Sequence, residues 1–103
     1  MFKEPTRILL IGNDLSLICA RRLLLEHAGF SVIEVQTEQD ALLQLQSSVA
    51  VRGVVICSTI DHVERQRLTK DLRQVEPGLA VMWLSCRDND PTEVVDWANL
   101  QVH

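Results

Sequence analysis

Short apolar runs alternate with longer amphipathic segments along this chain of 103 residues. The apolar runs have the length of strands, and they span Arg7–Gly12, Ser31–Gln36, Val51–Cys57 and Leu79–Leu84. The first, third and fourth runs are continuously apolar, which is typical of parallel strands covered by helices on both faces. The second run is mixed and suits a sheet edge. The pattern therefore predicts a parallel sheet.

The segments between these runs have the apolar spacing and end signals of helices. Helix starts are indicated at Asp14, Thr37–Asp40, Asp61 and Asp90-Pro91, and Gly29 is a helix stop. The residues that recur at helical spacing are Leu17, Ile18, Leu24, Leu25 and Ala28, then Ala41, Leu42 and Leu45, then Leu68, Leu72 and Val75. Residues Asn99–His103 alternate and could begin a fifth strand. This order predicts an α/β three-layer sandwich.

Composition and charge narrow the class of protein. Hydrophobic residues make up 47% and charged residues 23% of the chain, an ordinary globular balance. The net charge of −4 argues against a dedicated nucleic-acid binder, which normally has a basic face. No apolar run is long enough for a membrane span, and Glu4 and Pro5 interrupt the place where a signal peptide needs an apolar core. We expect a cytoplasmic protein of one domain.

Polar side chains gather where the predicted strands end. The clusters are Gly12-Asn13-Asp14, Thr37, Cys57-Ser58-Thr59 and Ser85-Cys86. Parallel sheets bind their ligands at the carboxyl ends of the strands, so these positions are candidates for chemistry. The three cysteines form no Cys-x-x-Cys pair, which disfavours a disulfide framework or a structural zinc site. The simplest interpretation of Cys57 is a partly buried apolar residue.

The stretch from Arg7 to Gln46 resembles the first half of a response-regulator receiver domain, the CheY-like module of bacterial two-component signalling. The similarity rests on an apolar strand that ends in a polar cluster, a helix that ends in Ala28–Phe30, the Thr-x-x-x-Ala-Leu motif at Thr37–Leu42, and the strand Val51–Cys57. The resemblance extends from about Thr6 to Val102. It implies a flavodoxin-like parallel sheet of order 2-1-3-4 whose fifth strand is partial or missing. It also implies a single receiver-like domain over residues 1–103, truncated near the start of that strand.

The resemblance places a phosphorylation site on residues that depart from the family pattern. Family members hold Mg²⁺ with acidic residues after the first strand, phosphorylate an aspartate after the third, and use a hydroxyl after the fourth and a lysine after the fifth. In this sequence Gly12 and Asn13 take the usual acidic places, and Asp14 follows them. Cys57 takes the phosphoacceptor position, and Ser85 matches the hydroxyl. The lysine would fall beyond His103.

These departures change the expected chemistry. Mg²⁺ prefers carboxylate oxygens, and a thiol is a poor ligand for it. We therefore expect no catalytic residue, no cofactor and no metal site, with Asp14 only a weak magnesium candidate. The chain is interpreted as a pseudo-receiver, not an enzyme, that signals through protein–protein interaction. The alternatives are a thiol-based sensor that uses Cys57 and, less favoured, a small α/β nucleotide-binding protein.

The expected partners are proteins. Val94, Val95 and Trp97 on the last helix are expected to lack cover and to form an interaction surface. Arg65, Arg67 and Arg73 are further candidate contacts. The fourth strand is expected to lie exposed at one edge, which favours pairing with another chain. The partner is then an output domain beyond the C-terminus, another protein, or a second copy bound through the face of the fourth strand and fourth helix. No nucleic-acid or membrane contact is expected.

Overall fold

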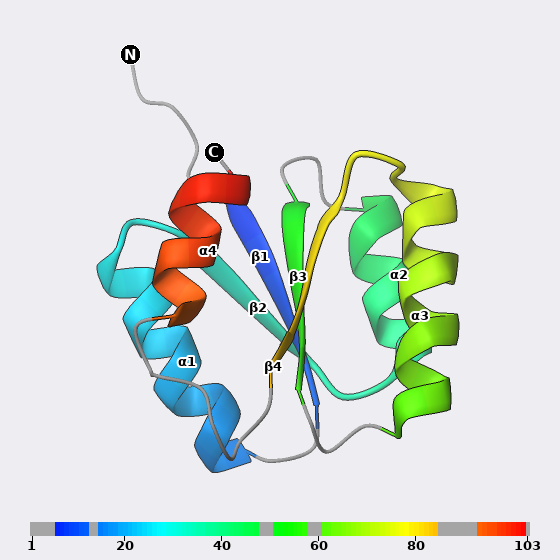
Figure 1. The fold of residues 1–103 in the computed structure, drawn as a ribbon, viewed down its shortest axis with the longest axis horizontal. Coiled ribbons are helices and arrows are strands. Elements are labelled where there is room, and N and C mark those ends of the chain that lie inside the picture. Colours follow the sequence, from blue (N-terminus) through cyan, green and yellow to red (C-terminus); the bar gives the residue numbers. More distant parts are fainter. Residues whose placement is uncertain (1–5, 13–14, 48–50, 58–60, 85–92, 103) are drawn as a thin grey trace.

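The computed structural model describes residues 6–12, 15–47, 51–57, 61–84 and 93–102. A four-stranded parallel sheet of order β2-β1-β3-β4 lies between two layers of helices (Figure 1). The strands are β1 (Arg7–Ile11), β2 (Ser31–Val35), β3 (Val51–Cys57) and β4 (Ala80–Leu84), and the helices are α1 (Leu15–His27), α2 (Glu38–Ser47), α3 (His62–Val75) and α4 (Glu93–Gln101). The three-layer α/β architecture, the strand order and the edge position of the second strand are confirmed.

Local signals determine where two of the helices begin or end. Gly29 follows α1 with φ of 98°, a left-handed conformation that glycine adopts without strain. Thr37 Oγ1 accepts a hydrogen bond from the Asp40 backbone N–H at 3.1 Å, which caps α2 as the motif predicts. His62 opens α3 directly after Asp61, which holds the N-cap position but forms no side-chain capping hydrogen bond. The predicted signal at Asp90-Pro91 lies outside the described residues. Within the described part of the chain, no helix combines the length and apolar character that a bilayer crossing requires.

The hydrophobic core consists of two layers, one on each face of the sheet. Because side chains alternate along a strand, Ile8 and Leu10 of β1 face one layer, and Leu9 and Ile11 face the other. The first layer contains residues of α1 and α4, and the second contains residues of α2 and α3 (Figure 1). The face of α1 that reaches the core carries Ile18 and Leu25, whereas Ala28 is exposed.

The last helix lies on the same side of the sheet as α1, which the sequence pattern did not indicate (Figure 1). A right-handed connection from β4 to a further parallel strand would carry its helix over the opposite face, where α3 lies. Helix α4 instead covers the uncovered half of the first core layer with Val94, Ala98 and the following Val102. The predicted start of a fifth strand is therefore wrong for residues 99–101, which are helical.

Burial in this layer also corrects part of the predicted interaction surface. Val94 has no exposed area and belongs to the core, so the prediction is wrong for this residue. Val95 and Trp97 are partly buried and pack against the same layer. The physical reason is the position of α4, because a helix that covers a sheet turns its apolar face inward.

Glu38 at the start of α2 contacts two charged residues of α3. A side-chain hydrogen bond with Asp71, together with burial, raises the pKa of Glu38, and Arg67, whose Nη2 donates to Glu38 Oε2 at 3.2 Å, opposes this rise. Because the pKa of Glu38 is higher in the folded chain, the folded chain keeps the carboxyl proton at pH values at which the unfolded chain has already released it. The contribution of Glu38 to stability therefore falls as the pH rises through its titration in the folded chain.

We expect Glu38→Gln to remove this fall, because the amide keeps a hydrogen-bond donor for Asp71 and does not titrate. Urea unfolding at a series of pH values between about 4 and 8 measures the difference between the two proteins. The same pH dependence of the unfolding free energy in both proteins would contradict the assignment.

Candidate functional site

The central strands β1 and β3 bring two of the predicted site residues together. Ile11 pairs with Ile56 in the parallel register, so the next residues, Gly12 and Cys57, lie side by side at the carboxyl ends of the strands. The Gly12 N–H donates to the Val35 carbonyl at 3.2 Å and extends the contact between β1 and β2. The sheet therefore holds the backbone of both residues in place.

The space between Gly12 and Cys57 is already filled. A Cβ at position 12 would lie 2.8 Å from Cys57 Cβ, 3.3 Å from Cys57 Sγ and 3.4 Å from Ile18 Cδ1. The first distance is shorter than ordinary carbon contacts allow. Glycine at position 12 and cysteine at position 57 are thus packed against each other, and a carboxylate at position 12 has no room.

Cys57 points into the core and not toward solvent. Its side chain has no exposed area and belongs to the layer between the sheet and helices α1 and α4. Cys57 is buried more deeply than the sequence suggested, and its role as an apolar residue stays a prediction. A reactive thiol needs some exposure, which Cys57 lacks, whereas Cys19 on α1 is exposed. The geometry thus does not favour the thiol-sensor alternative.

The described part of this site does not fit Mg²⁺. Gly12 offers no side chain, and the buried thiol of Cys57 is a poor partner for a hard cation. Among the described residues, no three His, Cys, Asp or Glu side chains are grouped as metal ligands would be. Asn13, Asp14 and Ser85 lie outside the described residues, so their predicted roles stay predictions.

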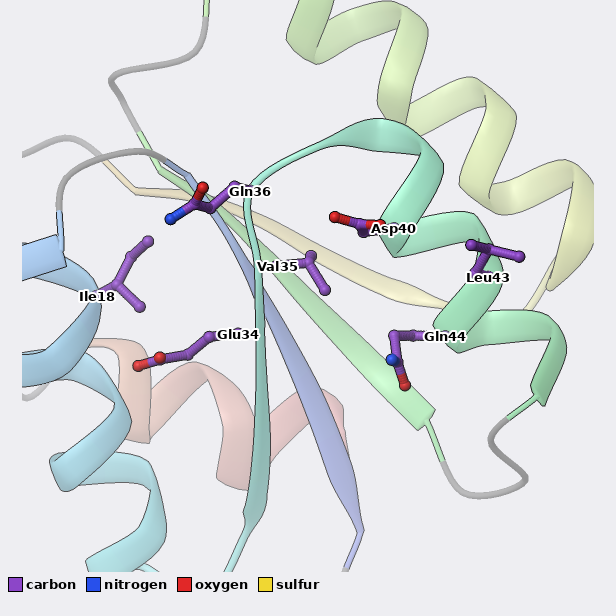
Figure 2. A pocket seen from close by; sticks show the side chains of 7 residues that line it. All are labelled: Ile18, Glu34, Val35, Gln36, Asp40, Leu43 and Gln44. Carbon is purple, nitrogen blue, oxygen red and sulfur yellow. The ribbon is translucent and has the colours of Figure 1, made fainter.

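A separate hollow of about 400 Å³ lies beside the edge strand β2 (Figure 2). It is lined by Ile18, Glu34, Val35, Gln36, Asp40, Leu43 and Gln44. Its two carboxylates come from β2 and α2, and Glu34 is paired with Arg22 at 3.2 Å. Of the residues that crowd position 12, Ile18 also lines this hollow, but neither Gly12 nor Cys57 does. The hollow is therefore separate from the ends of β1 and β3, where Gly12 and Cys57 lie.

A polar and aromatic cluster on β4 and α3 was not foreseen from the sequence. Trp83 Nε1 donates to Thr69 Oγ1 at 3.1 Å, and the Arg65 guanidinium lies 5.1 Å from the centre of the Trp83 ring. The His62 ring meets Trp83 edge-on, with centroids 5.7 Å apart. The spacing of Arg65 and Thr69 on one helical face was a usable signal, but the pairing of that face with Trp83 depends on the fold.

Comparisons with known proteins identify the architecture. No protein-family model and no curated protein matches the sequence. A receiver domain from Clostridium thermocellum superposes with a TM-score of 0.77 at 13% identity, over 94% of each chain. A receiver protein from Sinorhizobium medicae WSM419 gives 0.74 at 19% identity, over 96% of this chain and 95% of that one.

The same architecture also occurs in a designed protein. A de novo designed Rossmann-fold protein superposes with a TM-score of 0.62 at 19% identity, over 97% of this chain and 99% of the design. Function therefore has to come from the residues of the site and not from the arrangement of strands. The strand order, the two helical layers and the natural neighbours together show that this chain has the fold of CheY-like response-regulator receiver domains.

Proposed function

We propose that this chain is a receiver-like signalling module of a two-component system that is not phosphorylated by the aspartate and magnesium mechanism. It acts in the cytoplasm by binding another protein, and it catalyses no turnover. The observation that supports this most strongly is the packed pair of Gly12 and Cys57. The resemblance to receiver domains assigns this pair to the positions of a metal-binding carboxylate and of the phosphoacceptor, and the two residues are packed against each other with Cys57 fully buried.

The chemistry of phosphoryl transfer explains why this pair matters. The transferring phosphoryl group carries negative charge, which receivers balance with a metal ion and a lysine. A phosphodonor also has to reach the accepting atom. Cys57 Sγ is enclosed by the first core layer, and position 12 supplies no carboxylate for the metal. The same place therefore restricts the access of a phosphodonor to the accepting atom and lacks a carboxylate that would hold the metal ion.

The test is the intact mass of the protein after incubation with Mg²⁺ and a small acyl phosphate. We expect no phosphoryl adduct, while a conventional receiver domain with an aspartate at the acceptor position, treated in parallel, gains one. A stable adduct on this chain would overturn the proposal, and peptide mapping would then identify the modified residue.

A second sample, treated with a mild oxidant, distinguishes the thiol-based alternative. We expect Cys19 to be modified in the folded chain, because it is exposed, and Cys57 to be protected. Selective oxidation of Cys57 would favour the sensor function over the binding module.

A further inference from the structure

The outer edge of β4 is a candidate site for an added strand. This strand pairs with β3 on one side, and among the described residues no strand pairs with its other side. Natural edge strands are usually protected by a charge, a proline or a bulge. The β4 sequence, Ala-Val-Met-Trp-Leu, has no charged residue or proline. The opposite edge, β2, carries Glu34, which is ion-paired with Arg22.

Both faces of this edge present apolar side chains without complete cover. Val81 and Trp83 lie on the α3 side, where Trp83 keeps 38% of its surface exposed despite three contacts with α3. Ala80 and Met82 lie on the α1 and α4 side and are partly buried. A neighbouring strand would cover both pairs, because side chains of adjacent strands stand next to one another on each face.

Four charged residues of α3 lie on two different flanks of the helix. Arg67 and Asp71 face α2, where both interact with Glu38. Arg65 lies over Trp83, and Arg73 Nε donates to the Leu79 carbonyl at 3.4 Å, so both arginines lie on the β4 side.

Neither Arg65 nor Arg73 forms an ion pair within the described part of the chain. Arg65 Nε is also buried without a hydrogen-bond partner there. Within the described residues, Arg65 and Arg73 therefore give the flank of α3 beside β4 two positive charges without an ion-pair partner, although the chain as a whole carries a net charge of −4.

From the open edge and the cationic flank we infer that β4 binds an extended segment of a partner protein as an added strand, and that the residues of this segment facing α3 are acidic. The inference rests on the proposed function, since it names the partner of a module that acts by binding. Backbone hydrogen bonds supply the affinity in such strand addition, and alternate side chains supply the specificity. The favoured segment alternates acidic residues, which meet Arg65 and Arg73, with apolar residues, which meet Met82.

Charge also argues against a second copy as the occupant. Two β4 strands paired antiparallel are related by a two-fold axis perpendicular to the joint sheet, so both α3 helices would lie on the same face. The flanks carrying Arg65 and Arg73 would then face each other across the axis. Like charges in this arrangement oppose association, whereas an acidic strand neutralises them.

The probe is a fluorescein-labelled peptide of about nine residues in which glutamate alternates with valine and threonine. A matched peptide has lysine in place of glutamate. We expect fluorescence anisotropy to show binding of the glutamate peptide alone, and the binding should weaken as salt rises from about 50 to about 500 mM. Backbone amide shifts of the labelled protein should change at Ala80–Leu84 and on the β4 side of α3.

Variants on the two flanks of α3 provide the controls. The double variant Arg65→Gln/Arg73→Gln should weaken binding by about tenfold, since two charge contacts are lost. Arg67→Gln removes a charge from the opposite flank and should change the affinity less than about twofold. Arg65→Lys keeps the charge and should retain most of the affinity.

Four outcomes would overturn the inference: no binding, equal binding of the lysine peptide, amide shifts away from β4, or a dimer in sedimentation equilibrium that excludes the peptide. The last outcome would identify a second copy as the occupant. None of these results affects the phosphorylation test, and a phosphoryl adduct would overturn the proposed function without changing the peptide measurement. The two failures are therefore distinguishable.

Discussion

Replacing Gly53 with valine should lower the free energy of unfolding by about 1–3 kcal/mol, because the new side chain overpacks the contact between β3 and α4. A Cβ at position 53 would lie 2.8 Å from Val102 Cγ2 and 3.0 Å from Trp97 Cη2. Both neighbours belong to the helix that covers the first core layer or follow it directly. Helix α4 would have to move away from the sheet. Urea unfolding followed by circular dichroism measures the loss.

Two controls separate this packing effect from a general cost of replacing glycine. Gly78 has its nearest atom, Glu76 Oε1, 3.8 Å from the position of a Cβ, so Gly78→Ala should leave stability unchanged or raise it by up to about 1 kcal/mol. Val102→Ala removes the nearest neighbour, and Gly53→Ala should therefore cost less in that background than in the natural chain. Equal costs in both backgrounds would show that Val102 does not press on position 53.

Restoring a carboxylate at position 12 should lower the free energy of unfolding by about 3 kcal/mol or more, enough to threaten the fold of a small domain. Gly12 is buried, and the Cβ of Gly12→Asp would collide with Cys57 Cβ at 2.8 Å. The carboxylate would also enter an apolar layer that contains Ile18 and Leu84. Thermal and urea unfolding measure the change, and a Gly12→Asp variant as stable as the natural chain would contradict the packing described for this site.

Because Gly12→Asp can prevent folding altogether, a milder cycle tests the same contact. Gly12→Ala should cost about 1–3 kcal/mol on its own. Cys57→Ala keeps the Cβ that collides with position 12 and should rescue little of this cost. Cys57→Gly removes that Cβ, so Gly12→Ala should be much less costly in this background. Equal rescue by both cysteine variants would mean that Sγ, and not Cβ, makes the critical contact.

Much of the fold was predictable because its signals are local. The apolar runs mark the strands, and Gly29 and Thr37 act within one turn of the chain to end α1 and cap α2. The mixed character of β2 predicted an edge, since an edge strand is only partly covered. The adjacency of Gly12 and Cys57 was also predictable, because residues that follow neighbouring parallel strands must meet at the same rim.

Other features depend on contacts between segments far apart in the chain. The sequence predicted a helix near its end, but not that α4 would join α1 on one face of the sheet and bury Val94. It singled out Arg65, Arg67 and Arg73 together, whereas packing directs Arg67 toward Glu38 and Arg65 toward Trp83.

By itself, then, the sequence determined the strands, the end of α1 and the start of α2, because each is set by residue type and short-range spacing. Only the tertiary structure decided which face each helix covers, that Cys57 is fully enclosed, and that Arg65 and Arg73 lie beside a strand edge that no described strand pairs with. These features depend on which surfaces become buried against one another, and a periodic pattern does not specify the partner of an apolar face.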